Sequence, residues 1–465
     1  MPDRSPRRRT AIVIGGSAAG LFAAAVLADF ANVTVIEQDT LPERPETRRG
    51  IPQDRHAHLV WSGGVHAFDD ILPGIVDKAV SSGARLAHVM GDMVSRAPNE
   101  RWFRRFTTTH HHVLVCSRPL LDTVLRDRVL SDPRITHHQN TKVSGLQGTP
   151  ERITGVHLET AGTVSTLTAD LIVDASGRGS RTPAWLQSLG LPQVATREVN
   201  AGVAYATRLY KTPGTTEAIN FPLVNVQANP AKAPGQGGII LPIEDGRWIV
   251  TLSGTRGGEP TADPDAFVRF ALGLGDPIIG ELLADAEPLS DVATTRSTAN
   301  QRRYYEKMRQ WPDGYLVLGD AIASYNPVYG HGLTVAAQCA LAVRSVLHSR
   351  DITRPGTSRR LQRVAARPVA DAWGLAVGQD ALYPEATDTP PTTAERLLAR
   401  YVDHCVDTGA RNPRALEALL DVMSMSKRPT RLFSPAMLFP LLFGPKRPRL
   451  AGAPLSEEER QAASG

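Results

Sequence analysis

The feature that most constrains the fold is the run Gly15-Gly16-Ser17-Ala18-Ala19-Gly20, which lies between two short apolar stretches. It matches the dinucleotide-binding fingerprint, with Ser17 in the place of the second glycine. Gly15 permits a tight turn, the small residue at 17 lets the backbone approach a pyrophosphate, and Gly20 lets a helix pack on a strand. The run therefore predicts a strand, a phosphate-binding turn and a helix.

The residues around this run complete a βαβ unit. Residues 10–14 and 33–37 have the pattern of buried strands, and residues 19–29 that of a helix. Glu37 ends the second strand about 20 residues after the turn, where a carboxylate binds the ribose of a dinucleotide. We expect the phosphates to lie on the helix N-terminus, whose free N–H groups and dipole favour an anion.

An alternative for this region is an export signal. Arg7, Arg8 and Arg9 precede the apolar stretch over residues 11–28, as in a signal of the twin-arginine kind. The glycines and Glu37 fall where a nucleotide site needs them, so we favour the βαβ unit and interpret the arginines as a solvated tail.

A second motif lies some 300 residues downstream. The segment 314–320 has the pattern of a strand ending in Gly319-Asp320, and a Pro/Gly loop, residues 326–332, opens a helix reaching residue 348. Asp320 is placed to bind a ribityl hydroxyl, and the backbone of residues 330–333 to face the pyrimidine end of an isoalloxazine. A helix N-terminus there stabilises the negative charge of a reduced flavin.

The order of four segments resembles the flavoprotein hydroxylases of the para-hydroxybenzoate hydroxylase fold. The segments are the fingerprint with Glu37, Ser117-Arg118-Pro119-Leu120-Leu121-Asp122, Asp174-Ala175-Ser176-Gly177-Arg178-Gly179-Ser180, and Gly319-Asp320. The resemblance implies FAD as cofactor, an α/β FAD-binding domain of three layers, and an antiparallel sheet that covers the substrate. It also implies that Arg118 lies near the FAD pyrophosphate.

Within that superfamily the chain is most similar to the epoxidases of polyether-ionophore biosynthesis, of the lasalocid and monensin kind. The matching stretches are residues 49–53 with 55–58, 61–64, 220–224, 241–259 and 326–332. The resemblance implies epoxidation of an apolar polyene of polyketide or terpenoid type through a flavin C4a-hydroperoxide. It implies O2 as cosubstrate and NAD(P)H as the electron source, direct or through a flavin reductase, with the substrate free or held by a carrier protein.

The predicted site follows from these motifs. The expected FAD-binding residues are Gly15, Gly16, Ser17, Ala18, Ala19, Gly20, Glu37, Gln38, Arg49, Gln53, Arg118, Asp174, Gly319, Asp320, Pro327, Gly330, Gly332 and Leu333. Trp61, Tyr205 and Phe221 are candidates for the substrate pocket, with a plain core role as the open alternative. His56 and His58 are placed near the flavin by resemblance, or are structural. No catalytic side chain is named, because the cofactor carries the oxygen chemistry.

One departure from the aromatic hydroxylases concerns the electron donor. Their Asp-Gly dipeptide, tied to FAD and nicotinamide binding, is here Asp174-Ala175. The sequence also holds no second dinucleotide fingerprint. The reductant is therefore expected to bind transiently, or a separate reductase to supply electrons.

The pattern of elements predicts a discontinuous α/β chain. Residues 111–116, 153–158 and 164–173 read as strands and 119–130 as a helix, while 238–243 and 248–254 flank an Asp-Gly turn and form a hairpin. We expect FAD-binding segments at 1–75, 111–195 and 296–348, substrate-domain segments at 76–110 and 196–295, and a C-terminal helical region at 349–465. The apolar stretch 434–443, followed by Lys446, Arg447 and Arg449, is interpreted as a lid over the substrate domain, with membrane or partner docking as alternatives.

Several classes are disfavoured. The net charge of +5 and the absence of a basic stripe argue against a nucleic-acid binder. No stretch reaches the roughly 18 apolar residues needed to cross a bilayer. The three cysteines form no CxxC pair, which favours a reducing cytoplasm. His110-His111-His112 alternate along a strand, so no metal is expected.

Four other functions are alternatives, the last of them a non-enzymatic FAD-binding or carrier protein, which would show no turnover. A halogenase is disfavoured because no Trp-x-Trp pair occurs. Hydroxylation of an aromatic ring would need a base that ionises a phenol. A flavin dehydrogenase or reductase would not use O2. Neither Ser17 nor Ser62 shows a His-Asp pairing that would suggest a hydrolase.

Overall fold

The first 36 residues contain the predicted βαβ unit. In a computed structural model, β1 (Arg9–Ile14) and β2 (Ala31–Ile36) pair in parallel around α1 (Ala18–Leu27). The structure describes residues 8–107, 110–296, 298–389, 391–444 and 446–464. Arg7 lies outside this part, while Arg9 begins β1 and pairs with Asp351 at 3.3 Å. Arg9 is solvent-exposed as predicted, but it belongs to β1 and not to a tail, because the strand begins earlier than expected.

β1 is the centre of a five-stranded parallel sheet. Its strands, in spatial order, are β19 (Tyr315–Val317), β11 (Leu171–Asp174), β1, β2 and β7 (Ile135–His138). Val13, Ile172 and Leu316 are fully buried. Such continuous apolar runs are typical of parallel strands covered on both faces.

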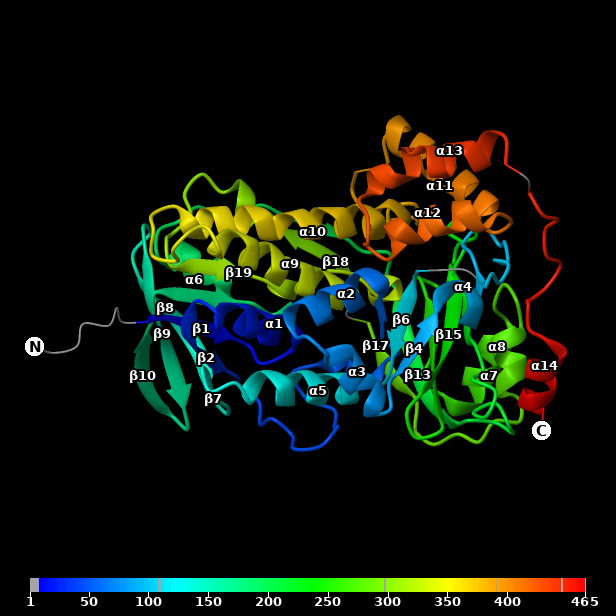
Figure 1. Cartoon of the computed structure of the whole chain (residues 1–465), viewed down its shortest axis with the longest axis horizontal. Helices are drawn as coiled ribbons and strands as arrows, with labels where there is room; N and C mark the ends of the chain where they lie inside the picture. Colours follow the sequence, from blue (N-terminus) through cyan, green and yellow to red (C-terminus); the bar gives the residue numbers. More distant parts are fainter. Residues whose placement is uncertain (1–7, 108–109, 297, 390, 445, 465) are drawn as a thin grey trace, which may run out of the picture.

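Helices and a small sheet cover the two faces of the parallel sheet, which makes three layers. On one side α1 packs against α5 (Arg118–Leu130) and α9 (Gly332–Leu347), and α10 (Thr357–Asp380) packs on α9 (Figure 1). On the other side lies an antiparallel meander of β8 (Lys142–Gly148), β9 (Ile153–Thr160) and β10 (Thr163–Thr168). The predicted three-layer α/β fold is confirmed.

The predicted single strand over residues 164–173 is wrong. The segment divides into β10 of the meander and β11 of the parallel sheet. Asp170 lies between them and ties the chain to β1, since its backbone N–H donates to the Thr10 carbonyl (3.0 Å) and its carboxylate accepts from the Thr10 N–H (2.9 Å). Two different sheets therefore share one apolar run.

A larger mixed sheet lies at the other end of the elongated molecule (Figure 1). Its strands, in spatial order, are β17 (Ala293–Thr295), β13 (Ala204–Lys211), β16 (Arg247–Gly254), β15 (Gln236–Ile243), β14 (Leu223–Val226) and β5 (Met93–Arg96). The predicted hairpin is β15–β16. One face packs on α7 (Pro264–Leu272) and α8 (Ile278–Leu283) around Trp248 and Phe267.

Smaller elements connect these layers. They are β3 (Leu59–Trp61), β6 (His112–Val115) and β4 (Arg85–His88) in one sheet; β12 (Thr196–Val199), β18 (Asn300–Arg303) and β20 (Ala323–Ser324) in another; the helices α2 (Ser62–Ile71), α3 (Ile75–Ser81), α4 (Val89–Asp92) and α6 (Thr182–Ser188); and the 3-10 turns η1 (Pro52–Arg55), η2 (Tyr305–Lys307), η3 (Gly319–Ala321) and η4 (Pro327–Tyr329).

The end of the chain forms a group of helices above the mixed sheet (Figure 1). They are α11 (Thr393–Gly409), α12 (Pro413–Met423), η5 (Pro429–Phe433) and α13 (Pro435–Leu442), and we call this group the C-terminal cap. A capping box of Thr392 and Glu395 begins α11, and Asn412 caps α12. A final helix, α14 (Glu457–Ser464), returns to α7 and α8 (Figure 1).

Residues 434–443 belong to the C-terminal cap. Met437 and Leu441 share a buried apolar cluster with Leu241 and Ile249 of the mixed sheet, which agrees with a cover over the substrate domain. α13 packs on α11, α12 and η5. Phe439 and Phe443 are 56% and 76% exposed. Pro435 does not interrupt α13 because it occupies the first turn, where no backbone donor is needed. None of the helices in the described part is both long and apolar enough to cross a membrane.

Candidate functional site

One cavity of about 720 Å³ joins the two sheet regions. It runs from the turn between β1 and α1, past the loop before α9, to the mixed sheet and the C-terminal cap. Its volume is within the range of roughly 300–1,000 Å³ typical of small-molecule and cofactor sites. We call it the central cavity.

Most of the predicted site residues line the central cavity. Those that do are Gly15, Ser17, Ala18, Ala19, Glu37, Gln38, Gln53, Arg118, Asp320, Pro327, Gly330, Gly332, Leu333, Trp61 and Tyr205. Those that stand behind its wall or outside it are Gly16, Gly20, Arg49, Asp174, Gly319 and Phe221. Residues from three distant parts of the sequence thus meet in one space.

The glycine turn has the backbone that a phosphate site needs. Gly15 has a φ of 104°, and a Cβ there would lie 2.6 Å from the Ala175 carbonyl oxygen. A Cβ at Gly20 would lie 1.8 Å from the Gly15 carbonyl oxygen, so only glycine lets α1 approach β1 this closely. No side chain caps the first turn of α1 at Ser17. Its N–H groups are therefore available to an anion in the cavity.

Four buried charges lie beside this turn. Arg48 lies 3.5 Å from Glu37 and 3.6 Å from Asp122, measured between nitrogen and oxygen, and Asp122 accepts from Arg118 at 2.8 Å. Arg118 also donates to the Ser17 hydroxyl at 3.1 Å. Glu37 is held in turn by the Gly16 and Asp39 N–H groups (2.8 and 2.9 Å). Alternating signs make the group neutral, which offsets the cost of burying each charge.

The arginine that faces the cavity is Arg48 and not the predicted Arg49. Arg48 is 7% exposed and lines the cavity, whereas Arg49 is exposed. The Arg48 backbone N–H donates to the carboxylate of Asp54, which turns the loop inward at that residue. Among the described residues, the Nε of Arg48 has no partner. This buried donor is available to a bound group.

Asp174 supports the wall of the cavity without reaching it. Its buried carboxylate accepts from the Ser176 N–H (2.9 Å) and the hydroxyls of Ser176 (2.6 Å), Ser180 (2.5 Å) and Thr182. These bonds fix the loop after β11. Asp320 does line the cavity, and burial raises its pKa against the opposing charges of Arg118 and Arg178.

A buried polar network holds the loop between β20 and α9. Asp380 accepts from Asn300 (2.6 Å), Asn326 (3.0 Å) and the Tyr329 hydroxyl (2.6 Å). The Asn326 side-chain oxygen accepts in turn from the Tyr205 hydroxyl at 2.5 Å. Burial raises the pKa of Asp380, although its three donors oppose this. The sequence analysis missed Asp380, which has no local motif and lies on α10.

Two histidines line the cavity between its two ends. His56 Nδ1 lies 2.7 Å from the Thr207 hydroxyl, and His58 Nδ1 donates to the His56 carbonyl oxygen at 2.7 Å. Burial lowers the pKa of each imidazole to about 4. Both rings are therefore neutral at pH 7. With Nδ1 as the donor, His58 Nε2 is left as an acceptor.

The three aromatic candidates have different positions. Tyr205 and Trp61 line the cavity, and Trp61 Nε1 donates to the Tyr329 carbonyl oxygen at 3.1 Å. Phe221 lies in the core beneath the mixed sheet, with its ring centroid 5.1 Å from that of Trp248. Phe221 is therefore a core residue, the alternative that the sequence left open.

The far end of the central cavity is largely apolar. Ile239 and Leu241 of β15 line its floor. The facing wall belongs to the C-terminal cap and consists of Val402, Val406, Leu416, Leu419, Leu420 and Met423. The sequence analysis missed this wall, because helical apolar faces at these positions are equally typical of a plain core.

The histidine run is structural in its contacts. His111 Nδ1 lies 3.1 Å from Ser62 Oγ, and its Nε2 lies 3.4 Å from Asp421 of α12. A Ser-His-Asp pairing that the sequence did not reveal therefore exists, but Ser62 donates to the His112 carbonyl oxygen (2.9 Å) and none of the three lines the cavity. In the described ranges, no group of three or more His, Cys, Asp or Glu could hold a metal ion.

The comparisons with known proteins agree with this geometry. The family described as "FAD binding domain" matches residues 8–350. The chain belongs to this family of FAD-binding proteins. The flavoprotein is also 32% identical over 427 residues to Protein Rv3254 of Mycobacterium tuberculosis, a match that covers 89% of each chain.

Solved structures share the fold of the flavoprotein. The flavin-dependent brominase Bmp2 has a TM-score of 0.63 at 14% identity, covering 93% of this chain and 97% of its own. PqsL of Pseudomonas aeruginosa, a probable FAD-dependent monooxygenase, has a TM-score of 0.61 at 18% identity, covering 85% and 99%. At these identities the likeness shows the fold alone.

FAD fits the residues present. The start of α1, which no side chain caps, suits the pyrophosphate, as does the Nε of Arg48, which has no partner among the described residues. Glu37 suits a ribose. The start of α9 also has no side-chain cap and meets the cavity at His331, Gly332 and Leu333. A positive helix end there suits the pyrimidine of a flavin.

Proposed function

We propose that the flavoprotein is an FAD-dependent monooxygenase that epoxidises an alkene in an apolar polyketide or terpenoid. The observation that carries the proposal is the apolar far end of the central cavity, continuous with the dinucleotide end. When bound and reduced, FAD supplies oxygen activated from O2. The protein's part is to hold an apolar chain near the cofactor and to exclude water.

The electrostatics of the cavity favour an alkene over a phenol. Hydroxylation of an aromatic ring usually needs a base to ionise the substrate. His56 and His58 have pKa values lowered to about 4, so they are weak bases, and burial raises the pKa of Tyr205 well above its usual value. An alkene needs no ionisation before it receives oxygen.

Neutral polar groups at the cavity complement the apolar wall. Asn225, Gln227 and Ser253 line it from the mixed sheet. Such groups can hydrogen-bond the hydroxyl or carbonyl oxygens of a polyketide without demanding a charge. NAD(P)H is the proposed electron source, direct or through a flavin reductase, and the substrate arrives free or on a carrier protein.

The test is turnover under ¹⁸O2 with a linear polyene. The FAD-loaded protein is supplied with NADPH, with and without an added flavin reductase, and the products are analysed by mass spectrometry. We expect substrate-dependent oxygen uptake and a product heavier by one labelled oxygen that acid opens to a diol. Anaerobic mixing with NADPH alone shows whether the reductant acts directly.

Other outcomes identify the other functions. A product changed by two hydrogens and lacking label would establish a dehydrogenase or reductase and reject the proposal. A phenol formed from an aromatic probe, with polyenes untouched, would establish the aromatic hydroxylase.

A further inference from the structure

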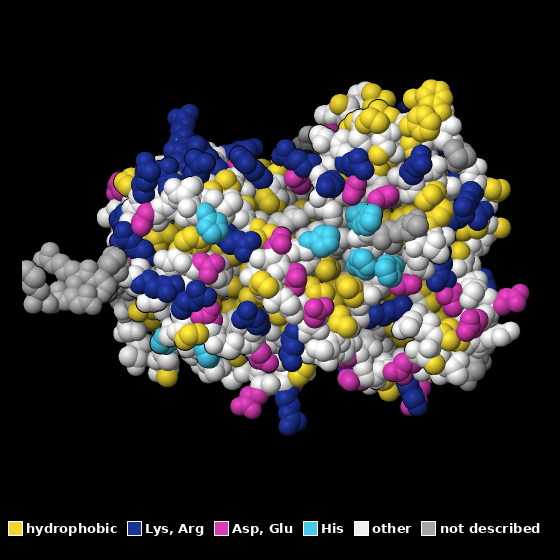
Figure 2. Space-filling model, viewed as in Figure 1, with side chains coloured by type: hydrophobic (Ala, Val, Ile, Leu, Met, Phe, Trp, Pro, Cys, Tyr) yellow, Lys and Arg dark blue, Asp and Glu magenta, His cyan; other side chains and the backbone are white. Residues whose placement is uncertain are grey.

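The C-terminal cap carries an exposed apolar surface on the side away from the central cavity. Phe433, Leu438, Phe439, Leu442 and Phe443 are 37% to 76% exposed, and we call them the α13 patch. Figure 2 shows apolar side chains gathered at the apex of the molecule over α13. Exposed apolar side chains that gather in one place mark an interaction site more often than apolar side chains scattered singly.

Positive charge surrounds the α13 patch. Residues 391–449 hold ten Lys or Arg and five Asp or Glu, a net charge of +5 that equals the net charge of the whole chain. The rest of the chain is therefore neutral on balance. Figure 2 shows Lys and Arg side chains around the base of the apolar apex.

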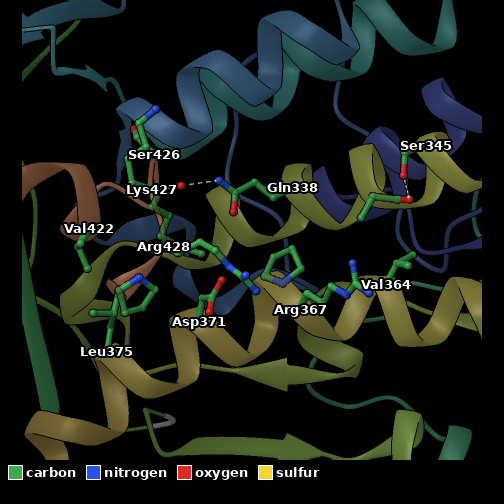
Figure 3. A pocket seen from close by; sticks show the side chains of 14 residues that line it. Gln338, Ser345, Val364, Arg367, Asp371, Leu375, Val422, Ser426, Lys427 and Arg428 are labelled. Atoms are coloured by element: carbon green, nitrogen blue, oxygen red, sulfur yellow. Dashed lines mark hydrogen bonds between the residues drawn. The ribbon is translucent and has the colours of Figure 1, made fainter. Parts of the chain in front are cut away.

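A groove of about 520 Å³ beside η5 concentrates this charge. It lies between α9, α10 and the loop after α12, and Arg367, Lys427 and Arg428 line it with the single carboxylate of Asp371 (Figure 3). The three cations are exposed, and no ion pair joins any of them to another described residue. η5 begins at the rim of the groove and ends at Phe433 of the patch.

We propose that the α13 patch and this groove dock the flavoprotein on an anionic lipid bilayer. Phe and Leu on a short helix, flanked by Lys and Arg, have the composition of a segment that lies in the membrane interface. The apolar residues would enter the acyl boundary, and the groove would take phosphate headgroups. α13 has eight residues, so it lies in the interface and does not span the bilayer.

The shape of the surface favours a lipid occupant over a protein. The patch projects at the apex of the molecule (Figure 2), so it can insert among acyl chains, whereas a folded partner would need a matching recess. Docking also suits an apolar substrate, since the inner face of the same cap lines the central cavity. The docking itself does not depend on the proposed reaction, because it is measured without substrate.

The test is co-sedimentation of the FAD-loaded full chain with vesicles. We expect at least tenfold stronger partitioning to phosphatidylcholine vesicles that contain phosphatidylglycerol than to phosphatidylcholine alone. Partitioning should fall as salt rises, because ions screen the groove. Phe439→Ser combined with Phe443→Ser should lower it at least tenfold. Lys427→Glu combined with Arg428→Glu should lower it by about fivefold or more for each charge removed.

Matched controls lie at the other end of the molecule and on α3. Val164→Ser alters a side chain that is 70% exposed on β10, and Lys78→Glu alters an exposed cation; neither should change partitioning. Flavin absorbance and the melting temperature verify that each variant is folded.

Three results would overturn the docking proposal. They are no binding to either vesicle, equal binding to both, and a concentration-dependent dimer in sedimentation velocity that the Phe variants abolish. The last would identify a second copy of the chain as the occupant. None of them bears on the oxygen-transfer assay, and failure of that assay would leave vesicle binding unaffected.

Discussion

At the scale of single residues, substitution of the buried charges beside the glycine turn is the strongest test of the cofactor site. Arg48 pairs with Glu37 and Asp122, and its neighbour Arg49 points to solvent. Two adjacent arginines on one loop therefore have side chains that point in different directions, so a substitution of Arg49 is the control for the same substitution of Arg48.

We predict that Arg48→Ala weakens FAD binding at least tenfold and lowers the free energy of unfolding by about 3 kcal/mol, because the buried carboxylates of Glu37 and Asp122 each lose one ion-pair partner. Arg49→Ala should change the free energy of unfolding by no more than about 0.5 kcal/mol. Flavin fluorescence titration of the apoprotein and urea unfolding measure the two effects. Equal losses in both variants would contradict the assignment of Arg48 to the site.

His331 is one of three histidines with a pKa of about 4, together with His56 and His58, that should make stability depend on pH. Its Nε2 donates to the Met423 carbonyl oxygen at 2.9 Å, and burial lowers its pKa from 6.5 to about 4. The folded state thus disfavours the proton that the unfolded chain binds. The resulting stability is present above pH 6.5 and is lost as the pH falls toward 4.

Between about pH 6 and 5 the unfolded chain binds a proton at His331 that the folded chain does not bind. We predict that His331→Gln therefore lowers the slope of the unfolding free energy against pH by about 1.4 kcal/mol per pH unit in this range. Glutamine keeps a donor for Met423. Urea unfolding over this pH range measures the slope, and His138→Gln, at an exposed position on β7, should leave it unchanged. An unchanged slope for His331→Gln would show that this imidazole is protonated in the fold.

At the scale of elements, α12 is the one that shapes the substrate end of the central cavity. Leu416, Leu419 and Leu420 line it from one helix face. We predict that Leu419→Trp raises the KM for a long polyene at least tenfold, or shifts the position of oxygen insertion, while FAD stays bound. Steady-state kinetics with FAD titration checks this.

The matched control for that variant is Leu398→Trp, on the outer face of α11 and 48% exposed. It adds the same ring without entering the cavity. Overpacking at Leu419 can cost about 1–3 kcal/mol, so the melting temperatures of both variants are compared first. Loss of activity in the control alone would place the substrate on the outer face.

The sequence predicted the elements whose chemistry is local. The strand, glycine turn and helix of residues 9–27 depend on steric rules within a few residues, and they were found. Whether Arg48 or Arg49 points inward depends on the contact with Asp54, and the place of Phe221 depends on the packing of a whole sheet face.

Contacts between distant segments could not be predicted from one sequence. Asp380 meets Asn326 from 54 residues away, and Asp421 meets His111 from 310 residues away. Neither residue lies in a motif, and both depend on how α10 and α12 pack on the rest of the chain. The cavity wall made by the cap is hidden for the same reason, because a Leu-rich helix face predicts burial but not what it faces.

At the scale of the whole molecule, the C-terminal arm packs on the end of the molecule that contains the mixed sheet. It runs from α13 to α14 and lies beside α7 and α8 (Figure 1). Leu455 is buried in the core beneath the mixed sheet, and Arg105 meets Glu459 at 2.7 Å. The side chains of this ion pair are only 26% and 12% exposed, so the cost of removing them from water offsets much of their attraction, and the apolar contact should dominate.

We predict that Leu455→Ala lowers the free energy of unfolding by about 2 kcal/mol, since a buried side chain is lost. Leu442→Ala, at a position 71% exposed, should change it by no more than about 0.5 kcal/mol. Urea unfolding compares the two. Equal stability of both variants would show that the arm is detached from the mixed sheet in solution.

The cap lies beyond residue 350, where the match to the FAD-binding family ends. Membership in the family therefore covers the cofactor end of the central cavity and the floor of its apolar end, but not the wall made by the C-terminal cap. Two relatives with equal family matches can differ in every residue of that wall. Grouping such proteins by the residues at positions 402, 406, 416, 419, 420 and 423 would separate them by the shape of the apolar end of the cavity, whereas the family match separates them only by descent.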